Sequence, residues 1–396
     1  MKLSKIFCAF AYAFAAAATL VFLGCKDKKN DGGSLNSEEI QEVSEKSSDH
    51  KWYYFSDGSY TETDLPQRSP ILSLKPWTES LRICDGNVTS SGKGLLLVNH
   101  FGVLLFDKDG EPRLIQDSAL FSGTTAGNLV FEDGVPFFTL AKNSFFNKNA
   151  ASSSSSSEKN ESETSHVIRL SLENSMFFPV ITYGDLKIAQ NAEVSGTYFD
   201  GNEWFSSIKS SENGRTDFRY IKWKPNGDLS TLSPSTKNGK IEISEISKDE
   251  YRKNLSPKNF SKAPSRLKTL LSSIPADFDF SVSLRKEAGV SPEYFSAGAQ
   301  NKNSESENEA NAILTPDWIC AVFGDGTVYF SGSLKERTLL NNGKTVAFRL
   351  PKLPSEYVYG DFCISGDYLA VAWEETDFYK TGRSGFLVVN MAKIFY

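Results

Sequence analysis

The chain has 396 residues and a formal net charge of −6, so it lacks the basic surface with which proteins bind nucleic acid. Aromatic residues make up 13% of the chain, and they favour the half-buried surface of a β-sheet. The content of three His and three Met argues against a metal enzyme.

The N-terminus has the pattern of a secretory signal. Lys2 and Lys5 give it a positive start, residues 6–23 are apolar, and Gly24-Cys25 follows. This end resembles the lipobox of bacterial lipoproteins, in which signal peptidase II cuts before the cysteine and the thiol receives a diacylglyceryl group. The resemblance implies a signal peptide at 1–24 and lipid attachment at Cys25. An uncleaved anchoring helix and an ordinary cleaved signal are the alternatives.

Residues 25–50 are polar and rich in Ser, Glu, Asp, Asn and Gly. Such a segment buries too little apolar surface to offset the entropy lost on ordering, so we expect a flexible tether. We expect the folded domain to run from 51 to 396, because Lys51–Phe55 (KWYYF) is the first run with the composition of a strand.

Short apolar runs alternate with turn residues along the remaining chain. Asp-Gly between apolar runs is a strong hairpin signal. Four such Asp-Gly breaks occur, at Asp57-Gly58, Asp133-Gly134, Asp200-Gly201 and Asp325-Gly326, and further turns are expected at His100-Phe101 and Asp107–Gly110. The sequence between these hairpins has no long amphipathic helical pattern, which favours an all-β fold of antiparallel sheets.

A β-rich run followed by a polar break recurs and predicts a repeat architecture. About seven degenerate copies are found, at Ser59–Leu65, Gly102–Ile115, His166–Glu173, Phe218–Lys224, Phe280–Lys286, Thr345–Pro351 and Gly385–Asn390. The shorter spacings match the roughly 40–50 residues of a four-stranded propeller blade. The copy at Gly102–Ile115 also resembles the PQQ-type propeller repeat, without its closing Trp and without a quinone site. We expect a seven-bladed β-propeller with degenerate PQQ- or WD40-like blades, six or eight blades being the alternatives.

Three segments interrupt the expected blades. They lie near 150–165, 245–275 and 296–311. The first contains six consecutive serines and the third has a similar composition, so both predict flexible loops. In the second, Ser247 and Glu250 have the spacing of a capping box, which predicts a short helix, and Arg266–Ile274 is another expected helix. We interpret this stretch as a helical insertion, which is either a lid or docking arm or a simply packed loop.

Candidate chemical groups each have an ordinary structural explanation. The Asp residues of the four Asp-Gly turns could form a ring that binds a cation, but Asp also suits the backbone of such turns. Asp107–Gly110 is similar to the start of a calcium loop but lacks its third acidic residue and its terminal Glu. His50, His100 and His166 fall in the tether, a turn and a loop edge, and no Ser/His/Asp set has catalytic spacing. We assign no catalytic, cofactor-binding or metal-binding residue.

Tryptophan and cysteine complete the set of distinctive residues. The tryptophans either pack between blades or stack on a sugar or an apolar partner, and we favour packing. They are Trp52, Trp77, Trp204, Trp223, Trp318 and Trp373. Cys84, Cys320 and Cys363 allow at most one disulfide, and we expect them to be buried apolar residues.

These patterns together predict a lipid-anchored protein of the cell envelope, facing the periplasm or the cell surface. We expect it to act as a binding or scaffold module with a protein or glycan partner on a propeller face, and not as an enzyme. The alternatives are an extracytoplasmic enzyme acting on a carbohydrate or peptide, and an accessory lipoprotein of outer-membrane protein assembly. We also expect Val388 or Val389 to pack inward, with the C-terminal strand beside an N-terminal strand in one sheet.

Overall fold

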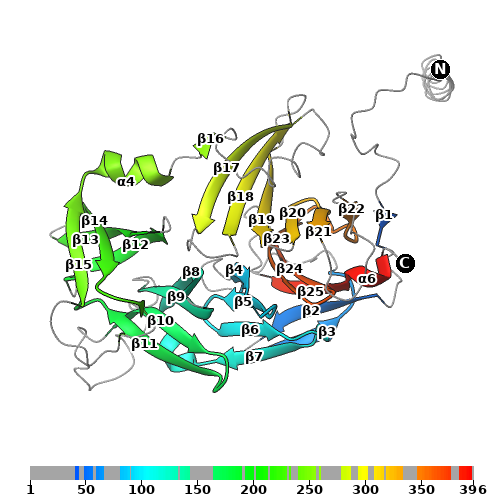
Figure 1. The fold of residues 1–396 in the computed structure, drawn as a ribbon, viewed down its shortest axis with the longest axis horizontal. Helices are drawn as coiled ribbons and strands as arrows, with labels where there is room; N and C mark the ends of the chain where they lie inside the picture. The colour runs from blue at the N-terminus through cyan, green and yellow to red at the C-terminus, as the bar shows by residue number, and fades with distance from the viewer. Residues whose placement is uncertain are drawn as a thin grey trace, which may run out of the picture. The chain divides into compact units, whose positions relative to one another are not determined.

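The computed structural model of the chain describes residues 41–394 except 44–48, 57–58, 67–80, 90, 133, 143–163, 190–191, 200–201, 213–214, 230–231, 233–239, 256–257, 260–277, 287–292, 302–306, 316–317, 333–345 and 376–382. The expected all-β class is confirmed. Strands dominate these residues, beside the short helices α2 (Ser118–Phe121), α4 (Lys248–Leu255) and α6 (Met391–Ile394) (Figure 1).

Three antiparallel sheets each contain four strands that are consecutive in the chain. Sheet I contains β4 (Ile83–Val88), β5 (Gly94–Val98), β6 (Gly102–Phe106) and β7 (Pro112–Gln116). Sheet II contains β8 (Thr124–Glu132), β9 (Val135–Lys142), β10 (Ser165–Ser171) and β11 (Met176–Thr182). Sheet III contains β12 (Ala192–Phe199), β13 (Trp204–Glu212), β14 (Arg215–Pro225) and β15 (Ile241–Ile246). Each sheet is a meander, as hairpin after hairpin in the sequence predicts.

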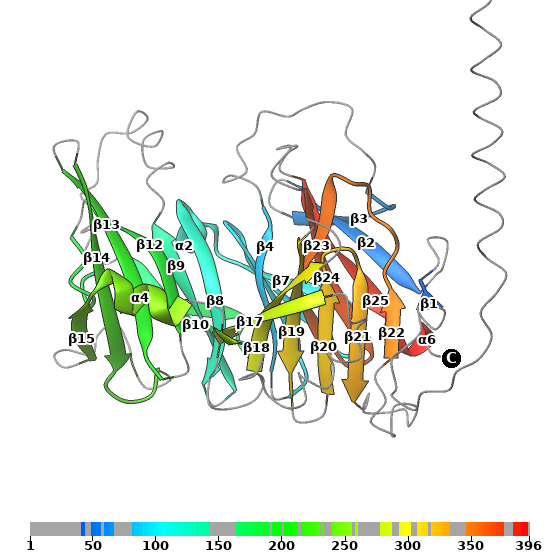
Figure 2. The same cartoon turned by 90° about the horizontal axis from the view of Figure 1, so that it is seen from above.

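Two larger sheets use strands from distant parts of the chain (Figure 2). Sheet IV contains eight strands: β16 (Lys258–Asn259), β17 (Phe278–Lys286), β18 (Glu293–Asn301), β19 (Glu307–Leu314), β20 (Trp318–Phe323), β21 (Thr327–Gly332), β22 (Val346–Arg349) and, parallel to β22, β1 (Gln41–Glu42). Sheet V contains five: β23 (Tyr357–Ser365), β24 (Tyr368–Glu375), β25 (Ser384–Asn390), β2 (His50–Ser56) and β3 (Ser59–Thr63).

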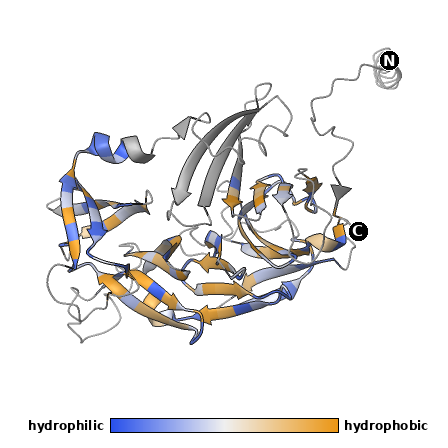
Figure 3. Cartoon of the chain, viewed as in Figure 1, coloured by the Kyte–Doolittle hydropathy of each residue, from blue (hydrophilic) through white to orange (hydrophobic). Residues whose placement is uncertain are grey.

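Separate apolar clusters fill the spaces between successive sheets. Strand β5 shows the arrangement best, since its five residues are all buried. Figure 3 shows the hydrophobic colouring that runs through the central strands of these sheets. Leu96 belongs to the cluster shared with sheet V, and Leu95 and Leu97 belong to the cluster shared with sheet II. A strand covered on both faces needs apolar residues at every position rather than at alternate ones. The run Gly94-Leu95-Leu96-Leu97-Val98 is therefore typical of a sheet packed between two others.

The C-terminal strand lies beside an N-terminal strand, as predicted. β25 pairs with β2 antiparallel, and Leu387 stands opposite Trp52. Val388 is 5% exposed and Val389 is fully buried. The two valines belong to different clusters, because successive residues of a strand point to opposite faces. The chain end differs from the expectation in one respect: the strand stops at Asn390 and continues as helix α6.

All seven repeat copies fall on strands, but they do not mark seven sheets. Three copies lie on β6, β10 and β14, the third strands of sheets I to III. Sheet V holds two copies, on β3 and β25, and sheet IV holds two, on β17 and β22. The repeat therefore marks strand–turn units, and the five sheets divide these units unequally.

Two expected boundaries are wrong. The tether was expected to reach residue 50, yet β1 pairs with β22, Val43 is 7% exposed, and its amide donates to the Arg349 carbonyl at 2.9 Å. Residues 296–311 were expected to form a loop, but β18 and β19 occupy most of that segment. Their small and polar side chains hid the strand pattern, because backbone pairing in a sheet needs no particular side chain.

Helix α4 confirms the predicted cap. Ser247 directly precedes the first helical residue, Lys248. Its hydroxyl accepts a hydrogen bond from the Glu250 amide at 3.1 Å. The expected helix at Arg266–Ile274, the serine run, the signal segment 1–24 and Cys25 lie outside the described residues.

Candidate functional site

The first strands of sheets II and III are irregular where they face each other. Strand β8 loses register with β9 between Gly127 and Val130, and β12 loses register with β13 between Val194 and Gly196. Asn128 adopts a left-handed backbone with φ 53°, which Asn tolerates better than most residues. A β-bulge leaves a residue out of the ladder and re-aims its side chain. Each of these two bulges therefore leaves polar groups of its strand out of the hydrogen bonding within the sheet.

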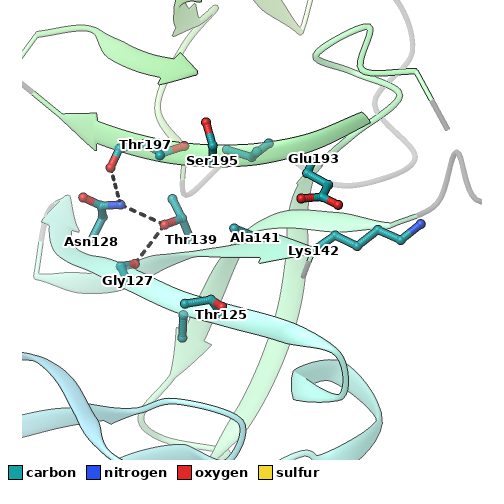
Figure 4. Close-up of a pocket in the computed structure, with 12 residues that line it drawn as sticks. Thr125, Gly127, Asn128, Thr139, Ala141, Lys142, Glu193, Ser195 and Thr197 are labelled. Carbon is teal, nitrogen blue, oxygen red and sulfur yellow. Dashed lines mark hydrogen bonds between the residues drawn. The ribbon is translucent and has the colours of Figure 1, made fainter. Parts of the chain in front are cut away.

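A cavity of about 330 Å³ lies between β8, β9 and β12, and we name it the β8–β12 pocket (Figure 4). Small and hydroxyl-bearing side chains form most of its lining, with Asn128, Lys142 and Glu193 as the larger polar members. The volume falls at the lower end of the range for small-molecule sites, about 300–1,000 Å³.

Asn128 fixes one wall of the pocket and links sheets II and III. Its amide nitrogen donates to the Thr139 hydroxyl at 3.0 Å and to the Thr197 carbonyl at 2.8 Å. Thr139, which is 4% exposed, donates in turn to the Gly127 carbonyl at 3.0 Å. Both amide hydrogens of Asn128 are therefore used, and its carbonyl oxygen accepts no hydrogen bond from a described residue.

A buried polar network lies next to the pocket and reaches it through Thr197. The Thr197 hydroxyl lies 3.0 Å from the Ser206 hydroxyl and 3.5 Å from Nε2 of His166. Nδ1 of His166 lies 2.8 Å from the Leu140 carbonyl, which can only accept, so Nδ1 carries the proton and Nε2 is the acceptor. Burial lowers the pKa of His166 from 6.5 to about 4. The ring is consequently neutral at physiological pH, and Trp223 Nε1 completes the network by donating to Ser206 at 3.0 Å.

Two charged residues line the same pocket from opposite strands. Lys142 is the last residue of β9, and its backbone amide donates to the Tyr183 hydroxyl at 2.7 Å. Burial raises the pKa of Tyr183 to about 12, so this hydroxyl stays protonated. Glu193 of β12 is partly exposed, and its carboxylate accepts no hydrogen bond from a residue that the structure describes.

Sheets I and II are joined by a second polar contact at the same bulge of β8. The Asp85 carboxylate accepts from the Gly86 amide at 2.9 Å and from the Leu129 amide at 2.7 Å. Asn87 donates from its side chain to the Leu129 carbonyl at 3.1 Å. Both side chains are buried. They therefore hold the bulge that carries Asn128 rather than face solvent.

The Asp-Gly turns are partly described. Asp325 accepts from the Thr327 amide at 2.9 Å, which confirms the predicted turn role. Asp57, Asp133 and Asp200 lie outside the described residues. In the calcium-like segment, Asp107 forms an ion pair with Lys93 at 3.1 Å. The Asp109 carboxylate accepts a hydrogen bond from the backbone amide of Glu111. Among the described residues, no three His, Cys, Asp or Glu side chains gather in a metal-binding group.

The histidine placements were partly wrong. His50 begins β2 instead of lying in a tether, and His166 is a fully buried residue of β10 instead of lying at a loop edge. His100 does lie in the turn between β5 and β6, with φ 61°. Its positive φ explains why the chain can turn tightly there.

Tryptophan packing is confirmed for the buried members of the set. Trp52, Trp204, Trp223 and Trp373 are each 4% exposed or less. Trp318 is half-buried against the core, and Trp77 lies outside the described residues. Cys320 and Cys363 are fully buried free thiols, as expected, and burial raises the pKa of both. Cys84 is only partly buried and donates to the Leu97 carbonyl at 3.4 Å.

The pocket residues were not found from the sequence. Gly127-Asn128 interrupts the apolar strand Thr124–Glu132, and Asp85-Gly86-Asn87 similarly interrupts β4. A polar break inside a strand is the available signal for a bulge. Asn128 bonds to Thr197 of β12, whereas Asp85 and Asn87 bond to Leu129 of β8. These partners are distant in the chain, so the contacts could not be predicted from the local pattern.

Comparisons with known proteins place the chain in a family. An uncharacterized lipoprotein of Treponema pallidum (strain Nichols) is 23% identical over 403 residues, covering 89% of this chain and 89% of that protein. The helices of the described residues are all too short or too polar to cross a bilayer. A family model described as a family of unknown function, DUF8086, matches residues 41–393, which begins at β1 and ends within α6. The chain belongs to this family.

Proposed function

We propose that the protein is a lipid-anchored component of the cell envelope and that its β-domain is a binding module. The β8–β12 pocket is the observation that carries the binding role. Two bulges open this pocket between neighbouring sheets, and a buried network holds its wall in place. A preformed polar cavity on a rigid scaffold is typical of a recognition site.

The proposal of a lipid anchor is based on the sequence. Gly24-Cys25 after the apolar segment resembles a lipobox, and the similar protein of T. pallidum is named a lipoprotein. The lipid would be attached at Cys25, and the signal peptide 1–24 would be removed. Because β1 begins at Gln41, the free tether would comprise residues 26–40 rather than reaching residue 50.

We further propose a propeller architecture with six blades, one of the expected alternatives. Sheets I to III have the four-stranded meander of single blades, and their first strands β4, β8 and β12 contact one another in order. β23 contacts β4, and β12 contacts β17, which supports a ring. Sheet IV has the eight strands of two blades, although β19 pairs with β20 and makes it one sheet. First strands line the channel of a propeller, so the pocket would open into that channel.

In-cell photo-crosslinking tests the binding role. A photoreactive residue replaces Ser195, an exposed residue of the pocket, and in a control replaces Ser244, an exposed residue of the outer strand β15. The proposal predicts a reproducible crosslinked product from position 195 and none from position 244. Equal yields at both positions, or no product from position 195, would contradict it.

A further inference from the structure

Two acceptors on the lining of the β8–β12 pocket receive no hydrogen bond from a described residue: the Glu193 carboxylate and the side-chain carbonyl of Asn128. The Asn128 amide hydrogens are used within the wall, which leaves its carbonyl oxygen for a ligand. Ser195 has one hydroxyl hydrogen, and it faces the Ser207 carbonyl at 3.1 Å and the Ser207 hydroxyl at 2.8 Å. The Ser195 side chain is therefore occupied by β13 and is not counted among the groups that meet a ligand. A ligand that matches these groups must bring donors.

Glu193 adds a negative charge to these acceptors. It lies on β12 two residues before Ser195, but the register shift between Val194 and Gly196 breaks the alternation of side chains there. Figure 4 accordingly shows the Glu193 carboxylate and the Ser195 hydroxyl on opposite sides of the strand, with the carboxylate between β12 and the end of β9. The Lys142 side chain runs outward in the same view, with its ammonium group farther than the Glu193 carboxylate from Asn128. Both charged groups line the pocket, and the carboxylate is the one that lies toward Asn128 in this view.

The lining also limits the type of molecule. The twelve lining residues include Thr, Ala, Gly, Asn, Lys, Glu, Val and Ser, and none is aromatic. Recognition in this pocket therefore depends on hydrogen bonds and charge and not on stacking against an aromatic ring. A carboxylate that is not yet paired forms its strongest hydrogen bonds with a positively charged donor.

We infer that the pocket binds a small organic molecule that carries a primary ammonium group beside further hydroxyl or amide donors, such as an amino alcohol or an amino sugar. The ammonium group pairs with Glu193, and a neighbouring donor binds the side-chain carbonyl of Asn128. This inference rests on the proposed binding function and specifies the ligand class of the same site.

Isothermal titration of the purified full-length protein in detergent tests the inference. Two pairs of probes differ only by an ammonium or hydroxyl group: ethanolamine against ethylene glycol, and glucosamine against glucose. The titrations are run at slightly acidic pH, where both amines are protonated. We expect saturable binding of at least one ammonium probe and at least tenfold weaker binding of its hydroxyl partner.

Glu193→Gln keeps the size of the side chain and removes its charge. It should weaken binding of the ammonium probe by about tenfold or more, since a hydrogen bond to an ionised group is roughly twice as strong as one between neutral groups. Glu242→Gln, on the exposed outer strand β15, is the matched control and should bind like the wild type. The melting temperature of each variant verifies its fold.

Three results would overturn the inference: no saturable binding of either amine, equal affinity for both members of each pair, or unchanged affinity in Glu193→Gln. The crosslinking result at position 195 is independent of these titrations. A crosslink at that position without amine binding would leave the binding function in place and reject the ammonium ligand alone.

Discussion

His166 contributes to stability through its protonation state. It is fully buried, its Nδ1 proton is bound to the Leu140 carbonyl, and burial lowers its pKa from 6.5 to about 4. Between these two values the unfolded chain binds a proton here and the folded chain does not. The free energy of unfolding must therefore fall as the pH drops from 6.5 to 4, and this contribution levels off below the lower value.

The expected loss from His166 over that range is on the order of 3 kcal/mol. His166→Asn removes the titration, and its side-chain amide can still donate to Leu140. Urea unfolding at several pH values should show a smaller decline for this variant than for the wild type. His50→Asn is the control and should alter the decline less, because His50 is only partly buried. Parallel curves for wild type and His166→Asn would contradict the prediction.

The sequence predicted the role of a single residue only where that role depends on residues close to it in the chain. Asp325 in its turn and Ser247 at its helix cap act on residues two or three positions away. Asn128 and Asp85 bind across sheets, to residues 69 and 44 positions away. Such partners depend on how whole sheets pack, which no local pattern records.

Strands β4 and β23 approach each other so closely that only glycine fits at Gly86. A Cβ atom at this position would overlap the carbonyl group of Phe362. Gly360, also on β23, would place a Cβ atom only in ordinary contact with Ala372, at 3.6 Å. The two glycines therefore form a matched pair for testing the contact between sheets I and V.

Gly86→Ala should lower the free energy of unfolding by about 3 kcal/mol or more, because overlap with backbone atoms forces the strands apart. Gly360→Ala should change it by less than about 1 kcal/mol. Guanidinium unfolding of both variants measures the difference. Equal midpoints would show that the strands are not packed this closely.

Most strands were predictable because hairpin turns separate short apolar runs. Element boundaries failed where this signal is weak. Strands β18 and β19 carry small and polar residues that resemble a loop. Strand β1 has two residues and is stable only because it pairs with β22 and because Val43 is buried. In both cases tertiary pairing overrides local composition.

The pairing of β2 with β25 joins the two ends of the described chain in sheet V. Leu387 is fully buried at the centre of this pairing, opposite Trp52 and Val371. Leu387→Ala should cost about 2–5 kcal/mol, as large-to-small changes in a core do. Ile394→Ala, in the partly buried helix α6, should cost less. Similar costs in urea unfolding would mean that the strand pairing contributes little to the fold.

Sequence reasoning anticipated this pairing but not how strands are distributed among sheets. Turn signals in the sequence identify hairpins, but they do not identify which hairpins belong to the same sheet. Sheet IV is an example. Its strands β19 and β20 pair with each other, with Leu314 opposite Ile319, so that two sets of four strands form one sheet. That joining is decided by long-range packing.

Lipid attachment at Cys25 is the central claim about the whole molecule, and metabolic labelling with a fatty-acid analogue tests it most directly. Cells expressing the wild type or Cys25→Ser are labelled, and the purified proteins are examined for label and by mass spectrometry for their N-terminus. We expect a labelled wild-type chain that begins at Cys25 and an unlabelled variant. A wild-type chain that retains residues 1–24, or that begins at Cys25 without lipid, would contradict it.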